Sequence, residues 1–117
     1  MDNVIQEKSF AFAVRIVRLG EYLRREKREY VLSNQVLRSG TSIGANIAES
    51  KNAQSDADFI SKMNIALKET TETIYWLRVL NATDYLTDAE TESLLSDCVE
   101  LEKILVSIIK TMKMKVK

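Results

Sequence analysis

The chain has 117 residues, a length typical of one domain and sufficient to bury a core without a metal or a disulfide. Its 17 lysine and arginine residues balance 17 aspartate and glutamate residues, so no net charge draws the whole molecule to phosphate or to a membrane. Hydrophobic residues make up 45% and charged residues 29%, which excludes a disordered chain. We expect a single domain over residues 1–117.

The first predicted helix covers about Asn3 to Lys27 and carries two apolar stripes at helical spacing. Its end is basic, as expected where the helix dipole is negative. One stripe is Phe10, Val14 and Val17, the other is Phe12, Ile16, Leu19 and Leu23, and the basic residues are Arg24, Arg25, Lys27 and Arg28.

The second predicted helix starts with Ser33 as its N-cap and runs to about Ser50. A polar connection over residues 51–54 follows, and Ser55 with Asp58 resembles a capping box that opens a third helix. The inward residues of the second helix are Val36, Leu37, Gly40, Ile43, Gly44, Ile47 and Ala48.

The third predicted helix runs into a turn at residues 81–87, where Thr87 and Glu90 form a capping box for a fourth helix. Its inward face holds Phe59, Met63, Ala66, Leu67, Thr70, Ile74, Leu77 and Asn81. The fourth helix places Leu94, Leu95, Cys98, Leu101, Leu105, Ile108 and Met112 inward.

No proline interrupts these segments, and only three glycines are present, which indicates an all-α protein. Short connections favour antiparallel neighbours, so we expect an antiparallel up-down-up-down four-helix bundle. The single cysteine and the lack of a signal-like start favour the cytoplasm. Apolar runs such as Phe10–Val14 fall far short of the roughly 20 residues that a membrane helix requires.

Catalytic chemistry finds little support in the sequence. Histidine is absent, which removes the commonest general base and metal ligand. Cys98 lies in register with Leu94 and Leu101, as a core residue would. Gly40 and Gly44 follow no predicted strand and lack the Gly-Lys-Ser/Thr ending of a phosphate-binding loop. We expect no enzyme and nominate no catalytic, cofactor-binding or metal-binding residue.

The second helix is rich in small residues, which allow a neighbouring helix to approach closely. Gly44→Leu should therefore overfill its packing. A polar stripe occupies another side of the helix, and it is either solvated or paired across an interface. The stripe consists of Gln35, Ser39, Ser42, Asn46 and Glu49.

Consecutive apolar or aromatic residues occur at Phe10–Val14 and at Tyr75–Leu77. They cannot all face one core, so a second buried surface is expected. Homo-oligomerisation is the usual way in which a small helical protein buries such a surface. We predict an oligomer.

The run from Gln35 to Glu49 reads Gln-x-x-Arg-x-x-x-Ser-Ile-x-x-Asn-Ile-x-Glu. With Asp58-Phe59 and residues 65–73, this pattern resembles the four-helix bundle proteins of the 23S rRNA-intervening-sequence family over nearly the whole chain. The matching motif positions are Gln35, Arg38, Ser42, Ile43, Asn46, Ile47 and Glu49, with Glu69 and Glu72 on the next helix.

The resemblance implies a ring-like homopentamer with no established enzymatic activity. The similar accessory proteins of diversity-generating retroelements bind a reverse transcriptase and nucleic acid, which suggests RNA. We interpret the motif residues, together with Gly44, as structural or interface residues. Arg38 is expected to place its guanidinium on a carboxylate of Glu69 or Glu72.

Two functions follow. The first, which we favour, is a non-catalytic oligomeric scaffold whose partner is another copy of the chain. The second is an RNA-binding accessory protein that uses a ring of basic residues formed by Arg24, Arg25, Lys27 and Arg28. The lysines of the C-terminal tail are further candidate contacts, namely Lys110, Lys113, Lys115 and Lys117. Both clusters lie at helix C-termini and are better explained as helix-end and solubilising charge. No cofactor, small-molecule substrate or membrane partner is expected.

Overall fold

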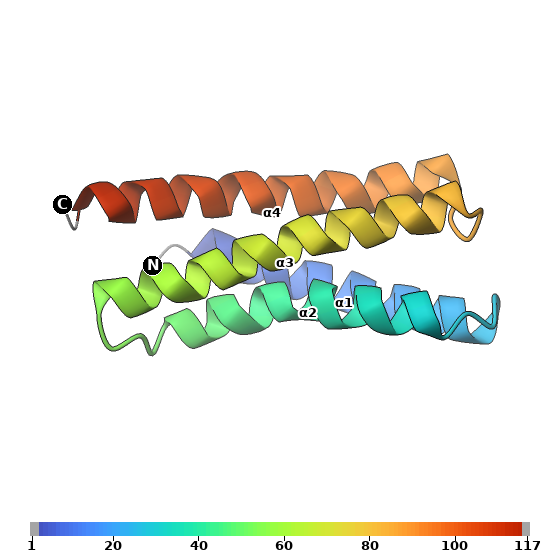
Figure 1. Cartoon of the computed structure of the whole chain (residues 1–117), viewed down its shortest axis with the longest axis horizontal. Coiled ribbons are helices and arrows are strands. Elements are labelled where there is room, and N and C mark those ends of the chain that lie inside the picture. Colours follow the sequence, from blue (N-terminus) through green and yellow to red (C-terminus); the bar gives the residue numbers. More distant parts are fainter. Residues whose placement is uncertain (1–2, 116–117) are drawn as a thin grey trace.

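The four helices run up and down in chain order, each antiparallel to the next (Figure 1). This computed structural model describes residues 3–115, and that range contains no strand. The helices are α1 (Asn3–Arg25), α2 (Val31–Ser50), α3 (Asp56–Ala82) and α4 (Asp88–Lys115). Contacts join α1 to α2, α2 to α3 and α3 to α4, while the α1–α4 seam has the fewest close backbone approaches. The predicted all-α four-helix bundle is confirmed.

One apolar core runs between the helices. It uses the predicted stripe of α1 that begins at Phe12, whereas the stripe that begins at Phe10 faces outward. On α4 the buried residue is Ile109 rather than the predicted Ile108, which is half-buried together with Met112. Ala48 of α2 is exposed, contrary to the prediction. The largest fully buried apolar side chains include Phe12, Ile16, Leu23, Ile43, Ile47, Met63, Leu77, Leu80, Leu101 and Leu105.

Side-chain caps open α3 and α4. The Ser55 hydroxyl accepts a hydrogen bond from the Asp58 N–H at 3.1 Å, whereas the Asp58 carboxylate accepts from the Gln54 N–H. Thr87 and Glu90 exchange both bonds of a full capping box, at 3.1 and 2.9 Å. The two predicted helix starts are confirmed, because each bond satisfies a backbone donor that the helix itself leaves free.

The predicted N-cap at Ser33 is wrong. The N-cap of the second helix lies three residues earlier, at Tyr30, which forms no side-chain cap, and the helix begins at Val31. Ser33 is instead fully buried, where its hydroxyl donates to the Gly20 carbonyl and accepts from Arg24. The Glu29 carboxylate accepts the Ser33 N–H at 2.7 Å, so a glutamate outside the helix satisfies that donor.

Candidate interaction surface

A polar seam joins α2 to α3. Arg38 divides its guanidinium between two acids of α3: Nη1 lies 3.3 Å from a Glu69 oxygen and Nη2 contacts Glu72. The structure thus pairs Arg38 with both expected partners, one nitrogen to each, rather than with one carboxylate. Gln35 accepts a further bond from Arg38. One guanidinium therefore neutralises part of two neighbouring charges, and an ammonium group could not span both.

Two more contacts extend the seam along α2. Deep inside, the hydroxyl oxygens of Ser39 and Thr73 are hydrogen bonded at 3.0 Å, and both residues are fully buried. Toward the end of α2, Glu49 pairs with Lys62 at 3.3 Å. The polar stripe predicted on α2 therefore faces α3 and is paired within one subunit at these positions.

Ser42 and Asn46 do not reach α3 in this way. The Ser42 hydroxyl donates to the Arg38 carbonyl at 2.6 Å, and the Asn46 amide donates to the Ser42 carbonyl at 2.9 Å. Both are half-buried and bond to their own helix. The structure brings Gln35, Arg38, Glu69 and Glu72 together and leaves these two outside that cluster.

Trp76 is a member of the seam that the sequence did not reveal. Its indole N–H donates to Glu72 at 2.9 Å, and its ring meets that of Tyr75 edge to face, with centroids 5.1 Å apart. The i,i+4 spacing of Glu72 and Trp76 was the available signal. The Trp76 indole therefore contacts the same Glu72 carboxylate as Arg38, so its fluorescence should respond to a change at that carboxylate.

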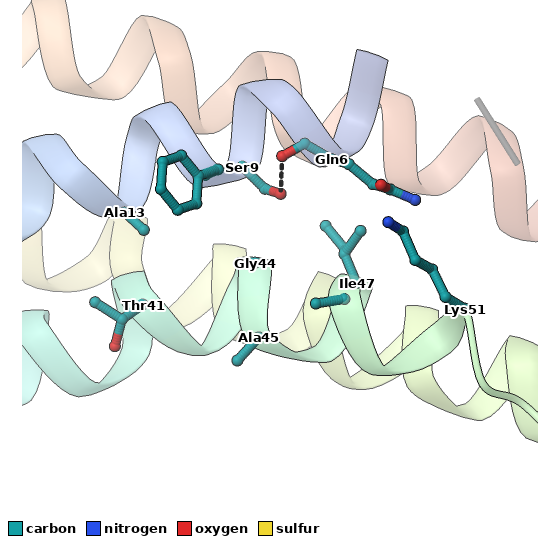
Figure 2. A pocket seen from close by; sticks show the side chains of 10 residues that line it. Gln6, Ser9, Ala13, Thr41, Gly44, Ala45, Ile47 and Lys51 are labelled. Carbon is teal, nitrogen blue, oxygen red and sulfur yellow. Dashed lines mark hydrogen bonds between the residues drawn. The ribbon is translucent and has the colours of Figure 1, made fainter. Parts of the chain in front are cut away.

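The opposite side of α2 approaches α1 closely at its glycines. A Cβ added to Gly40 would lie 2.8 Å from two carbons of the buried Ile16, and one added to Gly44 would lie 3.3 Å from the Ser9 carbonyl oxygen. Beside Gly44, a shallow cavity of about 410 Å³ opens between the helices (Figure 2). Figure 2 shows small side chains along much of its wall, with Ser9 and Ala13 on α1 and Thr41, Gly44 and Ala45 on α2. The longer side chains of Gln6, Ile47 and Lys51 line one end.

An apolar stripe lies on the outer side of α1, next to this cavity. Phe10 is 72% exposed, and Val14 and Val17 are 44% and 43% exposed. Tyr75 of α3 is also exposed. Monomeric proteins seldom present a contiguous row of apolar side chains to solvent.

The predicted basic cluster lies at the end of α1 and in the connection to α2. Arg24 is half-buried and donates to Ser33, and the Lys27 ammonium lies 5.9 Å from the centre of the Tyr22 ring. Arg25 and Arg28 are exposed, and neither forms an ion pair with any residue from 3 to 115. These two arginines are the free cations of the cluster.

Cys98 is buried in the core beside Thr70, whose carbonyl it contacts at 3.6 Å. Burial raises the pKa of its thiol from 9.0 to about 12, and the charges of Glu102 and Asp97 add to the rise. A protonated, enclosed thiol is a poor nucleophile. Within the described part of the chain, no cluster of three histidine, cysteine or acidic side chains could hold a metal ion.

The fold and the seam around Arg38 define the class of protein. It is a small four-helix bundle whose second helix carries a motif of small and polar residues. The model of the 23S rRNA-intervening sequence protein family matches residues 1–107, and the chain belongs to this family. A crystal structure of a protein with unknown function from the S23 ribosomal protein family of Bacteroides thetaiotaomicron is 57% identical, with a TM-score of 0.91. The match covers 92% of this chain and 96% of that one.

No curated protein matches the chain. The similarity to retroelement accessory proteins stays a prediction. No helix between residues 3 and 115 combines the length and apolar character needed to cross a bilayer.

Proposed function

We propose that the protein is a non-catalytic, homo-oligomeric scaffold of the cytoplasm. The observation that carries this proposal is the exposed apolar stripe of Phe10, Val14 and Val17 on α1. Burial of apolar area drives association, at about 25 cal/mol per Å² removed from water. A second copy is the partner always present at the same concentration, and the family resemblance implies a ring of five.

Self-association is tested by light scattering after size exclusion. The chain has a mass of 13.4 kDa, and we expect a particle of several times that mass at micromolar concentration. Val14→Asp places a charge in the middle of the stripe and should yield monomers with an unchanged helical spectrum, because the side chain is exposed. A wild-type protein that elutes as a monomer would refute the scaffold proposal.

A second candidate function is RNA binding through the basic cluster. The exposed, unpaired state of Arg25 and Arg28 favours it, since free cations can neutralise phosphate without breaking an ion pair. An assembled ring would repeat these two residues at one end of each copy.

RNA binding is tested with structured ribosomal RNA fragments across a salt series. Arg25→Ala/Arg28→Ala should weaken binding and flatten its salt dependence. Both arginines are exposed, so their removal should change phosphate contact without changing the fold. A variant at Arg24 would also remove its hydrogen bond to Ser33 and could change the fold. Lys110→Ala/Lys113→Ala, at the opposite end of the bundle, is the matched control. Absence of binding at low salt excludes this function.

A further inference from the structure

The outer side of α1 carries an acid at each end of its apolar stripe. Glu7 lies three residues before Phe10, and Glu21 lies four residues after Val17, so all of them share one side of the helix. Glu7 is exposed and forms no ion pair with any residue from 3 to 115. Glu21 pairs only with Arg18 of its own helix, at 3.3 Å. Along this side the order is therefore acid, apolar stripe, acid.

The outer side of α3 carries cations at comparable spacing. A row of exposed residues follows it at steps of three and four, namely Ser61, Asn64, Lys68, Thr71, Tyr75, Arg78 and Ala82. Lys68 and Arg78 are the charged residues of this row, and neither has an ion-pair partner among the described residues. Two shallow hollows lie along the row. The first, of about 450 Å³, includes Ile65 and Lys68, and the second, of about 520 Å³, includes Tyr75 and Arg78.

Contacts within the bundle fix how high these two sides lie relative to each other. Helices α1 and α3 run in the same direction, and both α2 and α4 link them (Figure 1). The route through α4 uses the contacts between Lys8 and Glu100, Arg15 and Asp97, and Cys98 and Thr70. The route through α2 uses the contacts between Ser9 and Gly44, Ser39 and Thr73, and Glu49 and Lys62. Both routes place Phe10 level with about residues 68–69 of α3. Since each residue adds about 1.5 Å along a helix, Val17 is level with about residue 75 and Glu21 with about residue 79.

We propose that the outer side of α1 in one copy packs on the outer row of α3 in the next copy, with both bundles at equal height and pointing the same way. The α1 helix then runs parallel to the neighbouring α3. Val17 meets Tyr75 at the second hollow. Phe10 leans toward the start of its own helix and enters the first hollow between Ile65 and Lys68. An exposed aromatic ring that fills a hollow is a common form of strong interface contact.

The charges that border this contact are complementary. At equal height Glu21 of one copy lies opposite Arg78 of the next, and Glu7 lies within one helical turn of Lys68. The acids of α1 and the cations of α3 therefore meet on both sides of the apolar contact. Such complementarity fixes the partner and the register of an interface.

Pairing of either side with itself opposes like charges. A two-fold contact of α1 with α1 about Val14 would place Glu7 of one copy opposite Glu21 of the other. A two-fold contact between the outer rows of α3 would bring Lys68 to Arg78. Contact between the two different sides avoids both repulsions.

The positions of α1 and α3 in the bundle allow the contact to repeat. No close backbone approach joins α1 to α3 within the described chain, so they occupy opposite corners. Each copy then offers one side of each kind. Repetition of such a contact leads to a closed ring or to a filament, depending on the rotation between neighbours.

The inference rests on the proposed self-association and is tested by mixing two variants. Phe10→Gln/Val17→Gln removes the apolar contact on α1, and Lys68→Glu/Arg78→Glu reverses the charges on α3. All four side chains are exposed, and glutamine and glutamate favour helix, so the bundle should keep its circular dichroism and melting temperature. Each variant alone should be monomeric. Their mixture should give a dimer of one copy of each, because the first retains an intact α3 side and the second an intact α1 side.

The outcomes separate the two proposals. A monomeric wild type refutes self-association itself. A wild-type oligomer that survives Lys68→Glu/Arg78→Glu, or a mixture that remains monomeric, overturns the pairing of α1 with α3 alone. Lys110→Glu/Lys113→Glu makes the same change of charge at exposed positions of α4 and should leave the assembly intact. Dissociation of this control would overturn the pairing, because the effect of charge reversal would then not depend on α3.

Charge exchange tests the orientation. Glu21→Lys should weaken assembly, and its combination with Arg78→Glu should restore it, because these two positions face each other between parallel copies. Glu7→Lys combined with Arg78→Glu should give no rescue. Rescue by the second combination instead of the first would show that the copies point in opposite directions, and it would overturn the proposed register.

Discussion

Gly40→Ala should destabilise the bundle even though alanine is the better helix former. The new Cβ would lie 2.8 Å from Cγ1 and Cγ2 of Ile16, which is fully buried and has no space to move aside. Overpacking of this kind costs about 1–3 kcal/mol, and the gain in helix propensity offsets about 1 kcal/mol of it. We expect a net loss of up to about 2 kcal/mol, measured by urea unfolding followed by circular dichroism.

Gly20→Ala is the matched control. There the nearest atom to an added Cβ is the flexible end of Arg24, at 3.2 Å, and the next contacts are at 3.8 Å. Gly20→Ala should therefore stabilise the bundle by up to about 1 kcal/mol. If Gly40→Ala stabilises to the same extent, the steric reasoning is refuted.

A double-mutant cycle assigns the cause of the loss. Ile16→Ala removes the two carbons that lie 2.8 Å from the new Cβ and leaves only the Ile16 Cβ, at 3.2 Å, so Gly40→Ala should be less destabilising in that background. An equal loss in both backgrounds would show that Ile16 is not responsible.

Three further predictions concern stability and reactivity. Gly44→Leu should cost about 1–3 kcal/mol because its Cβ meets the Ser9 backbone, and an unchanged melting temperature would contradict this. Arg38→Lys should lower the free energy of unfolding by only about 0.5–1 kcal/mol, because solvent screens its half-exposed ion pairs. It should also shift the fluorescence of Trp76, whose indole is bonded to Glu72. Unchanged stability and emission would exclude a contact of Arg38 and Trp76 with the same carboxylate. Cys98 should resist a thiol reagent until urea unfolds the chain. Because its folded pKa lies above 9.0, at about 12, its contribution to stability is complete below 9.0 and is lost as pH rises from 9.0 to about 12. Rapid labelling of the native protein would contradict this burial.

Local chemistry accounts for the features that were predictable from sequence. The capping bonds of Ser55 and Thr87 depend on residues three positions apart, so the sequence alone contains the interaction. The two stripes of α1 likewise follow from helical spacing, and the structure buries one and exposes the other. Choosing which stripe faces the core required the positions of the other helices.

The failures arise where tertiary contacts decide. Ser33 has the side chain of an N-cap, but its burial against Gly20 depends on a helix pair that the local sequence does not specify. The burial of Ile109 instead of Ile108 depends on which side of α4 faces the other helices, since adjacent residues differ by about 100° around a helix. Lys62 joins the polar seam through Glu49 on the other helix, which the local sequence does not specify either. The bond of Trp76 to Glu72, in contrast, lies within α3, and its i,i+4 spacing was visible in the sequence.

The α1–α4 seam has a consequence for the order in which the chain folds. Neighbouring helices can pair as local hairpins, whereas Lys8 and Glu100 are 92 positions apart, so this seam closes the longest loop in the molecule. With few close backbone approaches and exposed ion pairs, the seam should form last and open first. A bundle caught before this closure would offer its free α4 to the α1 of any neighbouring chain. Folding at high concentration therefore brings a risk of exchanged first helices, and dilution during refolding should suppress it.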